Sequence, residues 1–261
     1  MTTVFDFPRQ FRTYTSASFQ LQSINFGSSS MFNRAPNIYG TAEQVWVVNL
    51  TLPIMKTATH LAGVTGDALS TGYGTKLNDY RDLSGFLAKL KGRKNYVRLH
   101  DSFRCYPRGT GAGSFENVTA AKSDFTDDTK FTDGTKFVDS QGDFSLGRHY
   151  ATLGENGVAG SNNILISNLV ANQANSLMTG DLISIGNHLY EITDNAPSDA
   201  AGQSRVYIAP NLRQSYVAGD TVKLAFPTGI FALVDDTQGQ IMRDAMTNTT
   251  TVGLSFIEVI I

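Results

Sequence analysis

Residues 79–104 constrain the fold more than any other stretch of this sequence, because they predict one short amphipathic helix that runs directly into one strand. Within residues 79–92, apolar side chains recur at i, i+3, i+4 and i+7, so they share one face of a helix and form a candidate core face. These residues are Leu83, Phe86, Leu87 and Leu90. Asp79 suits the start of this helix, and Gly92 suits the left-handed position at its end. Residues 96–101 then alternate between polar and apolar side chains, which is typical of a strand with one covered face.

Almost all of the remaining sequence predicts short strands, separated by loops rich in glycine, serine, threonine and asparagine. The strongest strand covers residues 45–52, and we expect Pro53 to end it. Before it, strand-like apolar residues start at Phe19, change phase before Ile24, and are followed by a predicted turn at residues 27–30. One helix on such a scaffold predicts a mainly β fold, in which the helix lies on a β-scaffold.

A glycine-rich stretch at residues 106–113 indicates a boundary within the chain. After it, residues 163–225 predict a compact set of short strands, and one hairpin has Gly186-Asn187 at its turn. Gly219-Asp220 opens a strand in the same way as Gly180-Asp181 does. Such a set of strands is typical of a small β-barrel or sandwich.

The simplest domain organisation is one domain interrupted by another. The C-terminal run at residues 256–261 is too apolar to lie free in water, so it should pair in a sheet. We therefore expect residues 1–108 and 226–261 to form the β-sandwich domain with the helix. Residues 109–225 would form an inserted β-module, which is consistent with insertion at an exposed loop.

The low content of charged residues suggests that other protein covers much of the surface. Charged residues make up 17% of the 261 residues, which is below the quarter or so of a usual globular domain. The net charge of −2 provides no basic field for nucleic acid as the main ligand. The N-terminal segment is rich in aromatic residues, which we expect to dock on an adjacent subunit. These interface candidates are Phe5, Phe7, Phe11 and Tyr14.

No motif in the sequence carries recognisable catalytic or metal-binding chemistry. The acidic stretch at residues 124–143 lacks the closing glutamate of a calcium loop, which favours a solvated loop over a calcium site. His100, Asp101 and Ser102 cannot form a triad as strand neighbours, because adjacent side chains point to opposite faces. Residues 109–113 lack the lysine of a phosphate loop, and we interpret them as a hinge. We therefore expect no enzyme activity, no catalytic or metal-binding residue and no cofactor.

Two further features concern the compartment of the protein. The single cysteine, Cys105, excludes an internal disulfide bond. The first residues lack the basic and apolar regions of a signal peptide, and no run approaches about 18 apolar residues. We therefore expect neither secretion through a signal peptide nor insertion into a membrane.

Taken in chain order, several motifs resemble those of one protein family. They are the strand with Trp46 that ends in residues 52–55, the helix motif at residues 83–92, the strand followed by Pro107-Arg108-Gly109, and the later Gly-Asp hairpins. The chain resembles the distal tail proteins of long-tailed (siphovirus-type) bacteriophages. The helix that runs directly into a strand is the most specific of these motifs.

This resemblance implies a structural protein of the virion, assembled in the host cytoplasm and placed at the tail tip or baseplate. In such proteins a β-sandwich with one helix forms a hexameric ring, and an inserted β-module projects outward. The ring joins the tail tube protein above to the tail hub protein below. It leaves a central channel through which DNA and the tape measure protein pass. The family has no catalytic residues that could be carried over to this chain.

The sequence leaves other interpretations open. A tail terminator or the tail tube itself would belong to the same class of ring proteins. The inserted module could instead be a carbohydrate-binding β-module for attachment to the host surface. A polysaccharide-cleaving enzyme would need a close pair of carboxylates in a cleft, and the sequence does not indicate one. Trp46 fits a core position, an interface or a platform for stacking sugars.

Overall fold

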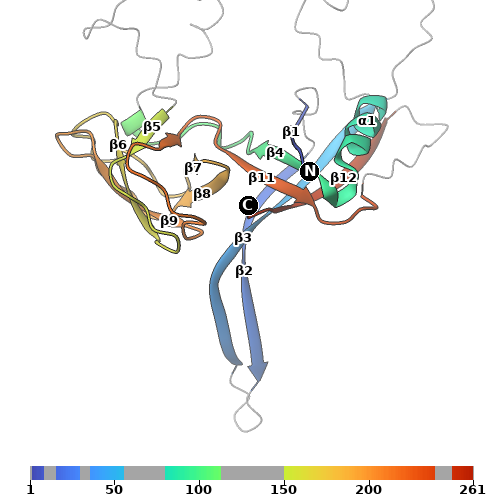
Figure 1. The fold of residues 1–261 in the computed structure, drawn as a ribbon, viewed down its shortest axis with the longest axis horizontal. Helices are drawn as coiled ribbons and strands as arrows, with labels where there is room; N and C mark the ends of the chain where they lie inside the picture. The colour runs from blue at the N-terminus through green and yellow to red at the C-terminus, as the bar shows by residue number, and fades with distance from the viewer. Residues whose placement is uncertain are drawn as a thin grey trace, which may run out of the picture. The chain divides into compact units, whose positions relative to one another are not determined.

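The computed structural model describes residues 2–8, 16–29, 36–55, 80–112, 150–238 and 249–260 (Figure 1). The described chain is mainly β, with twelve strands and one α-helix, as the sequence predicts. It divides into two compact units, which we call the sheet unit (residues 1–99 and 229–261) and the barrel unit (residues 100–228). A small barrel is thus inserted into a sheet domain that carries the helix, and the expected fold class is confirmed.

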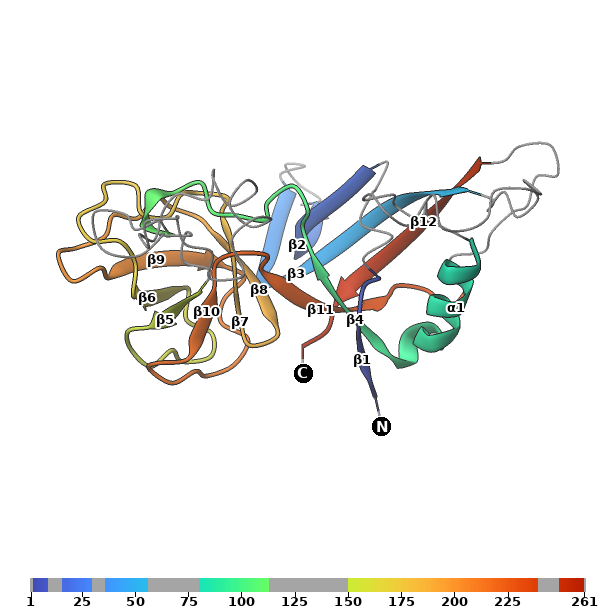
Figure 2. The ribbon, with the colours of Figure 1, turned by 90° about the horizontal axis from the view of Figure 1, so that it is seen from above.

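The sheet unit contains a six-stranded mixed sheet. In order across the sheet, its strands are β1 (Val4–Asp6), β4 (Tyr96–His100), β11 (Thr228–Leu233), β12 (Thr249–Glu258), β3 (Pro36–Met55) and β2 (Ser16–Ser29). β1 is parallel to β4, whereas β12 is antiparallel to both β11 and β3. Figure 2 shows β12 and β3 side by side. The C-terminal strand therefore pairs in this sheet, as its apolar sequence predicts.

One face of the sheet holds the core of the sheet unit. Trp46 of β3 is fully buried there, with 0% of its surface exposed. Phe19 of β2 and Phe231 of β11 meet on this face with ring centroids 6.4 Å apart, although two strands lie between them in the sheet. Since three strand spacings span about 14 Å in a flat sheet, this sheet must curl around its core. Trp46 is therefore a core residue and not a platform for stacking sugars.

The helix α1 (Tyr80–Leu90) is shorter than the predicted helix at residues 79–92. It ends because Lys91 and Gly92 both adopt a left-handed backbone, with φ angles of 50° and 64°. A short 3-10 helix, η2 (Gly92–Lys94), follows. Of the predicted core face, Leu87 is half-buried and three residues are buried, namely Leu83, Phe86 and Leu90. Asp79 lies outside the described residues.

The strand after the helix has the predicted alternation. In β4, Val97 and Leu99 are buried, with 0% and 1% of their surfaces exposed. The side chains between them are only half-buried. The helix and β4 are therefore correctly predicted by their apolar spacing, since both cover one face of the same unit.

Two predictions about the first hairpin are wrong. β3 does not end at Pro53 but continues to Met55, paired with β12. Among the described residues β2 ends its pairing at Thr51, so Pro53 has a strand on one side, where the missing N–H is tolerated. The predicted turn at residues 27–30 is also misplaced, because β2 stays paired with β3 as far as Ser29.

The register of the same hairpin is irregular at the place where the sequence predicts a change of phase. The pairing of β2 with β3 shifts between Ser23 and Asn25. One residue separates Ser23 from Asn25 on β2, whereas three residues separate their partners Gln44 and Gly40 on β3, so the longer segment lies on β3.

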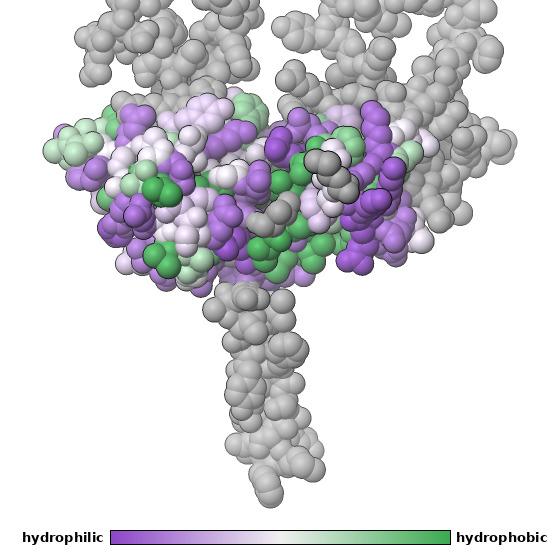
Figure 3. All heavy atoms as spheres, viewed as in Figure 1, coloured by the Kyte–Doolittle hydropathy of each residue, from purple (hydrophilic) through white to green (hydrophobic). Residues whose placement is uncertain are grey.

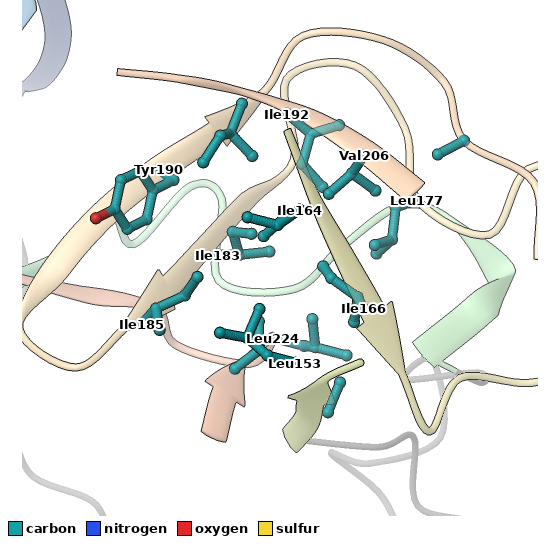
Figure 4. Close-up of a cluster of buried hydrophobic side chains, with 14 of the residues drawn as sticks. Leu153, Ile164, Ile166, Leu177, Ile183, Ile185, Tyr190, Ile192, Val206 and Leu224 are labelled. Atoms are coloured by element: carbon teal, nitrogen blue, oxygen red, sulfur yellow. The ribbon is translucent and has the colours of Figure 1, made fainter. Parts of the chain in front are cut away.

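The barrel unit contains a closed barrel of six short strands. In order around the barrel, the strands are β10 (Thr221–Lys223), β5 (Tyr150–Leu153), β6 (Asn163–Ser167), β9 (Ser204–Ala209), β8 (His188–Ile192) and β7 (Leu182–Ile185). Mostly aliphatic side chains from all six strands fill its interior (Figure 4). The predicted hairpin is confirmed, because Gly186 and Asn187 form the two-residue turn between β7 and β8.

The barrel consists of two similar halves, which are β5–β6–β7 and β8–β9–β10. The strand pairs have matching registers, since Thr152 pairs with Ser167 in the first half and Glu191 pairs with Ala209 in the second. Two isolated bridges also correspond, namely Leu177 with Ala196 and Tyr216 with Gly157. β10 pairs with β5 as β7 pairs with β8. The two Gly-Asp strand openings in the sequence are therefore equivalent positions of an internal repeat.

The barrel unit begins earlier in the chain than the boundary expected at residue 109. Residues 100–108 belong to it because they contact its other segments. The backbone N–H of Phe226 donates to the carbonyl of Cys105 at 2.7 Å. The ring of Phe226 also packs against those of His100 and Tyr106, with centroids 5.7 and 5.0 Å away. The segments that lead into and out of the barrel are thus joined to each other.

Candidate interaction sites

The strand β2 forms one edge of the six-stranded sheet, and this edge lacks the usual protection against pairing with another chain. β2 is 14 residues long and contains neither a charged residue nor proline. The opposite edge, β1, has 3 residues, and its Asp6 forms an ion pair with Arg98. Proteins usually block exposed edges with short strands, charges or proline. In the part of the chain that the structure describes, β2 pairs with β3 alone, so its outer edge is available to a further strand.

β2 and β3 continue as a hairpin beyond the rest of the sheet, as Figure 1 shows. β12 pairs with β3 from Met55 to Val47, whereas β2 pairs with β3 as far as Pro36. We call residues 25–29 and 36–40 the hairpin arm. A two-stranded ribbon is at best marginally stable in water on its own. The arm therefore gains no support from β12, because β12 pairs with β3 only from Met55 to Val47.

The face of β2, β3 and β12 that lies opposite the core is uncharged, and its polar side chains are mixed with the half-buried Val45, Val47 and Ile257. We call it the outer face. Its side chains alternate with the buried ones over residues 16–23, 44–52 and 251–257, and none of the residues in these ranges is charged. Examples are Gln20, Asn49 and Thr251, all of which are exposed. Such a face offers hydrogen-bonding groups without the cations that hold nucleic acid phosphates.

In the barrel unit, Asp181 anchors the segment that leads into the barrel. Its side chain is buried, and its carboxylate accepts the backbone N–H groups of Arg108 at 3.0 Å, Gly109 at 3.4 Å and Met178 at 2.9 Å. The Arg108 guanidinium donates to the same carboxylate at 3.3 Å and also to the carbonyl of Thr179. A buried carboxylate needs such donors to offset its lost hydration. These bonds fix the segment on the barrel.

The predicted hinge at residues 109–113 is therefore wrong for its described part. Gly109 and Gly111 are buried, and Ala112 lies in the barrel core. A Cβ atom on Gly109 would lie 2.2 Å from the carbonyl oxygen of Ser176, and one on Gly111 would lie 1.7 Å from its Oγ. These glycines serve close packing of two backbones and not flexibility. Gly113 lies outside the described residues.

The predicted interface residues fall into three groups. Phe7 is buried in its own unit, where its ring packs edge-on against Phe86 with centroids 5.6 Å apart, so it is a core residue. Phe5 is half-buried in β1. Phe11 and Tyr14 lie outside the described residues. The sequence contains too little signal here, because a parallel strand of three residues has no periodicity that could reveal its pairing with β4.

The other segments singled out in the sequence provide no chemistry in the described structure. The acidic stretch at residues 124–143 lies outside the described residues. Within the described ranges, no three His, Cys, Asp or Glu side chains gather where they could hold a metal ion. The thiol of Cys105 donates to the carbonyl of Ser102 at 3.0 Å. A search of the described helices finds none with the length and apolarity needed to cross a membrane.

Large apolar side chains are exposed on the barrel unit, but they are scattered. They are Phe103, Tyr150, Val158, Tyr207 and Val217. On the face that Figure 3 shows, the apolar atoms of this unit form separate spots. Scattered apolar residues are normal on a protein surface, whereas a broad continuous patch would mark a docking face. The face of the barrel unit that Figure 3 shows therefore carries no broad apolar docking surface.

Two buried tyrosines give the barrel a specific dependence on pH. The hydroxyls of Tyr190 and Tyr216 lie 3.3 Å apart, and the Tyr216 hydroxyl donates to the carbonyl of Ile185 at 3.0 Å. Burial raises the pKa of Tyr216 well above its ordinary value of 10.0, and the hydrogen bond with Tyr190 raises it further. Above about pH 10 the unfolded chain loses this proton while the folded barrel keeps it. The stability of the barrel must therefore fall as the pH rises through this range.

We predict that Tyr216→Phe makes this alkaline loss of stability shallower. One retained proton accounts for up to about 1.4 kcal/mol per pH unit of the unfolding free energy. The measurement is the unfolding free energy of the barrel in urea at several pH values between about pH 9 and pH 11. Hydrogen exchange of the barrel strands monitors the unfolding. Ile166→Val, which removes one buried methylene from the same core, is the control and should keep the slope of the unmodified protein. Equal slopes for the unmodified protein and Tyr216→Phe would contradict the prediction.

No model of a known protein family matches the sequence, and no curated protein matches it.

Proposed function

We propose that this protein is a structural component of a bacteriophage tail tip, where copies of the chain form a closed ring, most simply a hexamer, around a channel. The observation that carries the proposal is the long, uncharged outer edge of β2 together with the hairpin arm. A closed ring forms when one contact between two different surfaces is repeated from copy to copy. Pairing of the β2 edge with an adjacent copy provides such a contact.

The outer face supports the same function. If β2 joins neighbouring copies, the curled sheets would continue around the ring, and one face of them would border the channel. A channel for DNA should not bind phosphates strongly, and the outer face is free of charged residues over its described ranges. The resemblance of the motifs to distal tail proteins leads to the same proposal. The tail tube protein, the tail hub protein and the tape measure protein are then the proposed partners.

The proposal is tested by the state of assembly. We expect the full-length protein at tens of micromolar to sediment as a closed oligomer, with native mass spectrometry giving about six copies. Gln20→Lys with Gln22→Lys places two cations on the exposed surface of β2 and should weaken assembly at least tenfold, because charges oppose edge pairing. Thr251→Lys is the matched control, since Thr251 is exposed on the same face but in the interior strand β12.

Two outcomes would contradict the proposal. A protein that stays monomeric at these concentrations, and that particle images do not place in a ring, would favour the carbohydrate-binding alternative, which a glycan array then tests. Equal loss of assembly in the β2 variant and in Thr251→Lys would place the contact on the outer face and not on the edge.

A further inference from the structure

The two Gly-Asp turns of the barrel have the same internal geometry. In the first turn, Asp181 donates its backbone N–H to the carbonyl of Met178 at 3.0 Å, and its carboxylate accepts the N–H of Met178 at 2.9 Å. In the second turn, Asp220 makes the same two bonds to Val217, at 3.0 and 2.8 Å. The glycine before each aspartate has a positive φ angle, of 86° and 93°. The two turns are therefore equivalent places in the two halves.

In the first half, the chain itself covers this place with residues 108–111, and the last two of these begin the short 3-10 helix η3 (Thr110–Ala112). The N–H groups of its first two residues donate to Asp181, as described above. The next two N–H groups donate to the carbonyls of Asn175 at 2.9 Å and Ser176 at 2.8 Å. As a consequence, Ser176 and Asp181 are buried, with 0% and 3% of their surfaces exposed. We call residues 175–181 the covered strip.

In the second half, the equivalent residues 214–220 are exposed except for the buried Tyr216, and we call them the open strip. Gln214 and Ser215 correspond to Asn175 and Ser176, and Asp220 corresponds to Asp181; all three are exposed. Val217 is 64% exposed. Val158 is 67% exposed and lies diagonally opposite Val217 across the bridge between Gly157 and Tyr216, so the two valines border the strip.

We propose that the open strip binds a short segment of a partner protein in which arginine is followed by glycine, in the manner in which the covered strip binds residues 108–111. The carboxylate of Asp220 would take the place of Asp181 as acceptor for the guanidinium and for two backbone N–H groups. The carbonyls of Gln214 and Ser215 would accept the next two N–H groups. The partner segment would take the bent backbone of residues 108–111, so backbone hydrogen bonds would give affinity and the glycines would give selectivity.

The requirement for glycine follows from the covered strip. There, a Cβ atom at either glycine of the bound segment would lie within 2.2 Å of an atom of Ser176. Ser215 occupies the corresponding place in the open strip. A segment with larger residues at these positions could not approach the strip closely enough to make both backbone bonds.

The depth of the bound segment is limited by the barrel core. In the first half the chain continues inward, and Ala112 enters the core beside the small residue Ala151. In the second half, Tyr190 stands at the position equivalent to Ala151, and Tyr216 stands at that of Leu177. Their larger side chains fill the interior, so the partner segment must stay on the surface. We therefore expect about four residues of the partner segment to contact the open strip.

The experiment uses the full-length protein and a fluorescent synthetic peptide with the sequence of residues 106–111, Tyr-Pro-Arg-Gly-Thr-Gly. Fluorescence anisotropy should show saturable binding, and bound peptide should slow hydrogen exchange at residues 214–220. Asp220→Asn retains an acceptor for the N–H of Val217, so the turn persists, but it loses the charge. It should weaken binding at least about tenfold, as should Val217→Lys, which adds a cation beside the arginine of the peptide.

Two controls make the result specific to the open strip. Asp194→Asn changes an exposed aspartate in another loop of the barrel and should leave the binding unchanged. A peptide with alanine in place of both glycines should bind at least about tenfold more weakly, because each added Cβ would approach Ser215 too closely. Absence of saturable binding would overturn the inference. Equal binding by Asp220→Asn, or slowed exchange at residues 175–181 instead of 214–220, would also overturn it. The inference is independent of the ring proposed above.

Discussion

Asp181→Ala should lower the unfolding free energy of the barrel by about 3–5 kcal/mol. The carboxylate accepts three backbone N–H groups, and two of them belong to the segment that closes the barrel next to Ala112. Each buried N–H left without an acceptor costs about 1–3 kcal/mol. The ion pair itself adds little, because the side chain of Arg108 is 63% exposed. We therefore attribute the effect to the lost backbone bonds.

The measurement must distinguish the unfolding of the barrel from that of the sheet unit, and two different probes do so. Trp46 is the single tryptophan and lies in the core of the sheet unit, so its fluorescence follows that unit. Hydrogen exchange of β6 and β9 follows the barrel. Asp181→Ala should shift the exchange transition in urea strongly and the fluorescence transition little. Asp181→Asn, which keeps one acceptor oxygen, should lower the unfolding free energy of the barrel less than Asp181→Ala does.

Asp194→Ala is the matched control for this experiment, because Asp194 is an exposed aspartate in a loop of the same barrel. Its unfolding free energy should stay within about 0.5 kcal/mol of that of the unmodified protein. If Asp181→Ala behaves like this control, the segment at residues 108–111 is held by the buried Ala112 that follows it and not by the carboxylate.

The parts of the fold that the sequence predicted well are those with a strong local period. The helix face of Leu83, Phe86 and Leu90 and the alternation in β4 each repeat over a whole element, so burial of one face leaves a clear pattern. The turn at Gly186-Asn187 was predictable because few residue pairs adopt the backbone of a two-residue hairpin loop.

The parts that the sequence did not predict depend on contacts between distant residues. Phe7 was expected at an interface, but a parallel pairing with β4 brings it against Phe86, and no local pattern encodes that pairing. Gly109 and Gly111 resemble a flexible linker in the sequence, whereas in the fold they permit close contact with Ser176. Composition alone cannot separate glycine that provides freedom from glycine that provides space.

The candidate sites were partly visible in the sequence but were not recognised there. The uncharged run through β2 could have indicated an edge without protection, if the order of the strands had been known. The repeated Gly-Asp openings could have indicated the two halves of the barrel. What the sequence cannot show is that the chain covers one of the two turns and leaves the other exposed, because that difference arises from residues 108–111, which are distant in the chain.

Phe86→Ala should lower the unfolding free energy of the sheet unit by about 3–5 kcal/mol. Phe86 is 5% exposed, and its ring packs edge-on against that of Phe7 at an interplanar angle of 87°. Truncation removes the buried ring and leaves a cavity beneath α1, and the two losses add. Here the fluorescence of Trp46 should report the shift in urea, while exchange of β6 and β9 should change little.

Ser84→Ala provides the control on the same helix, because Ser84 is exposed and alanine favours helix slightly more than serine does. It should change the unfolding free energy by no more than about 0.5 kcal/mol. A double-mutant cycle with Phe7→Ala then tests the contact itself, since an edge-on aromatic pair contributes about 0.5–1.5 kcal/mol of coupling. If Phe86→Ala shifts the Trp46 transition no more than Ser84→Ala does, the helix does not cover the sheet core. A cycle without coupling would instead leave Phe7 available for the interface that its aromatic sequence first suggested.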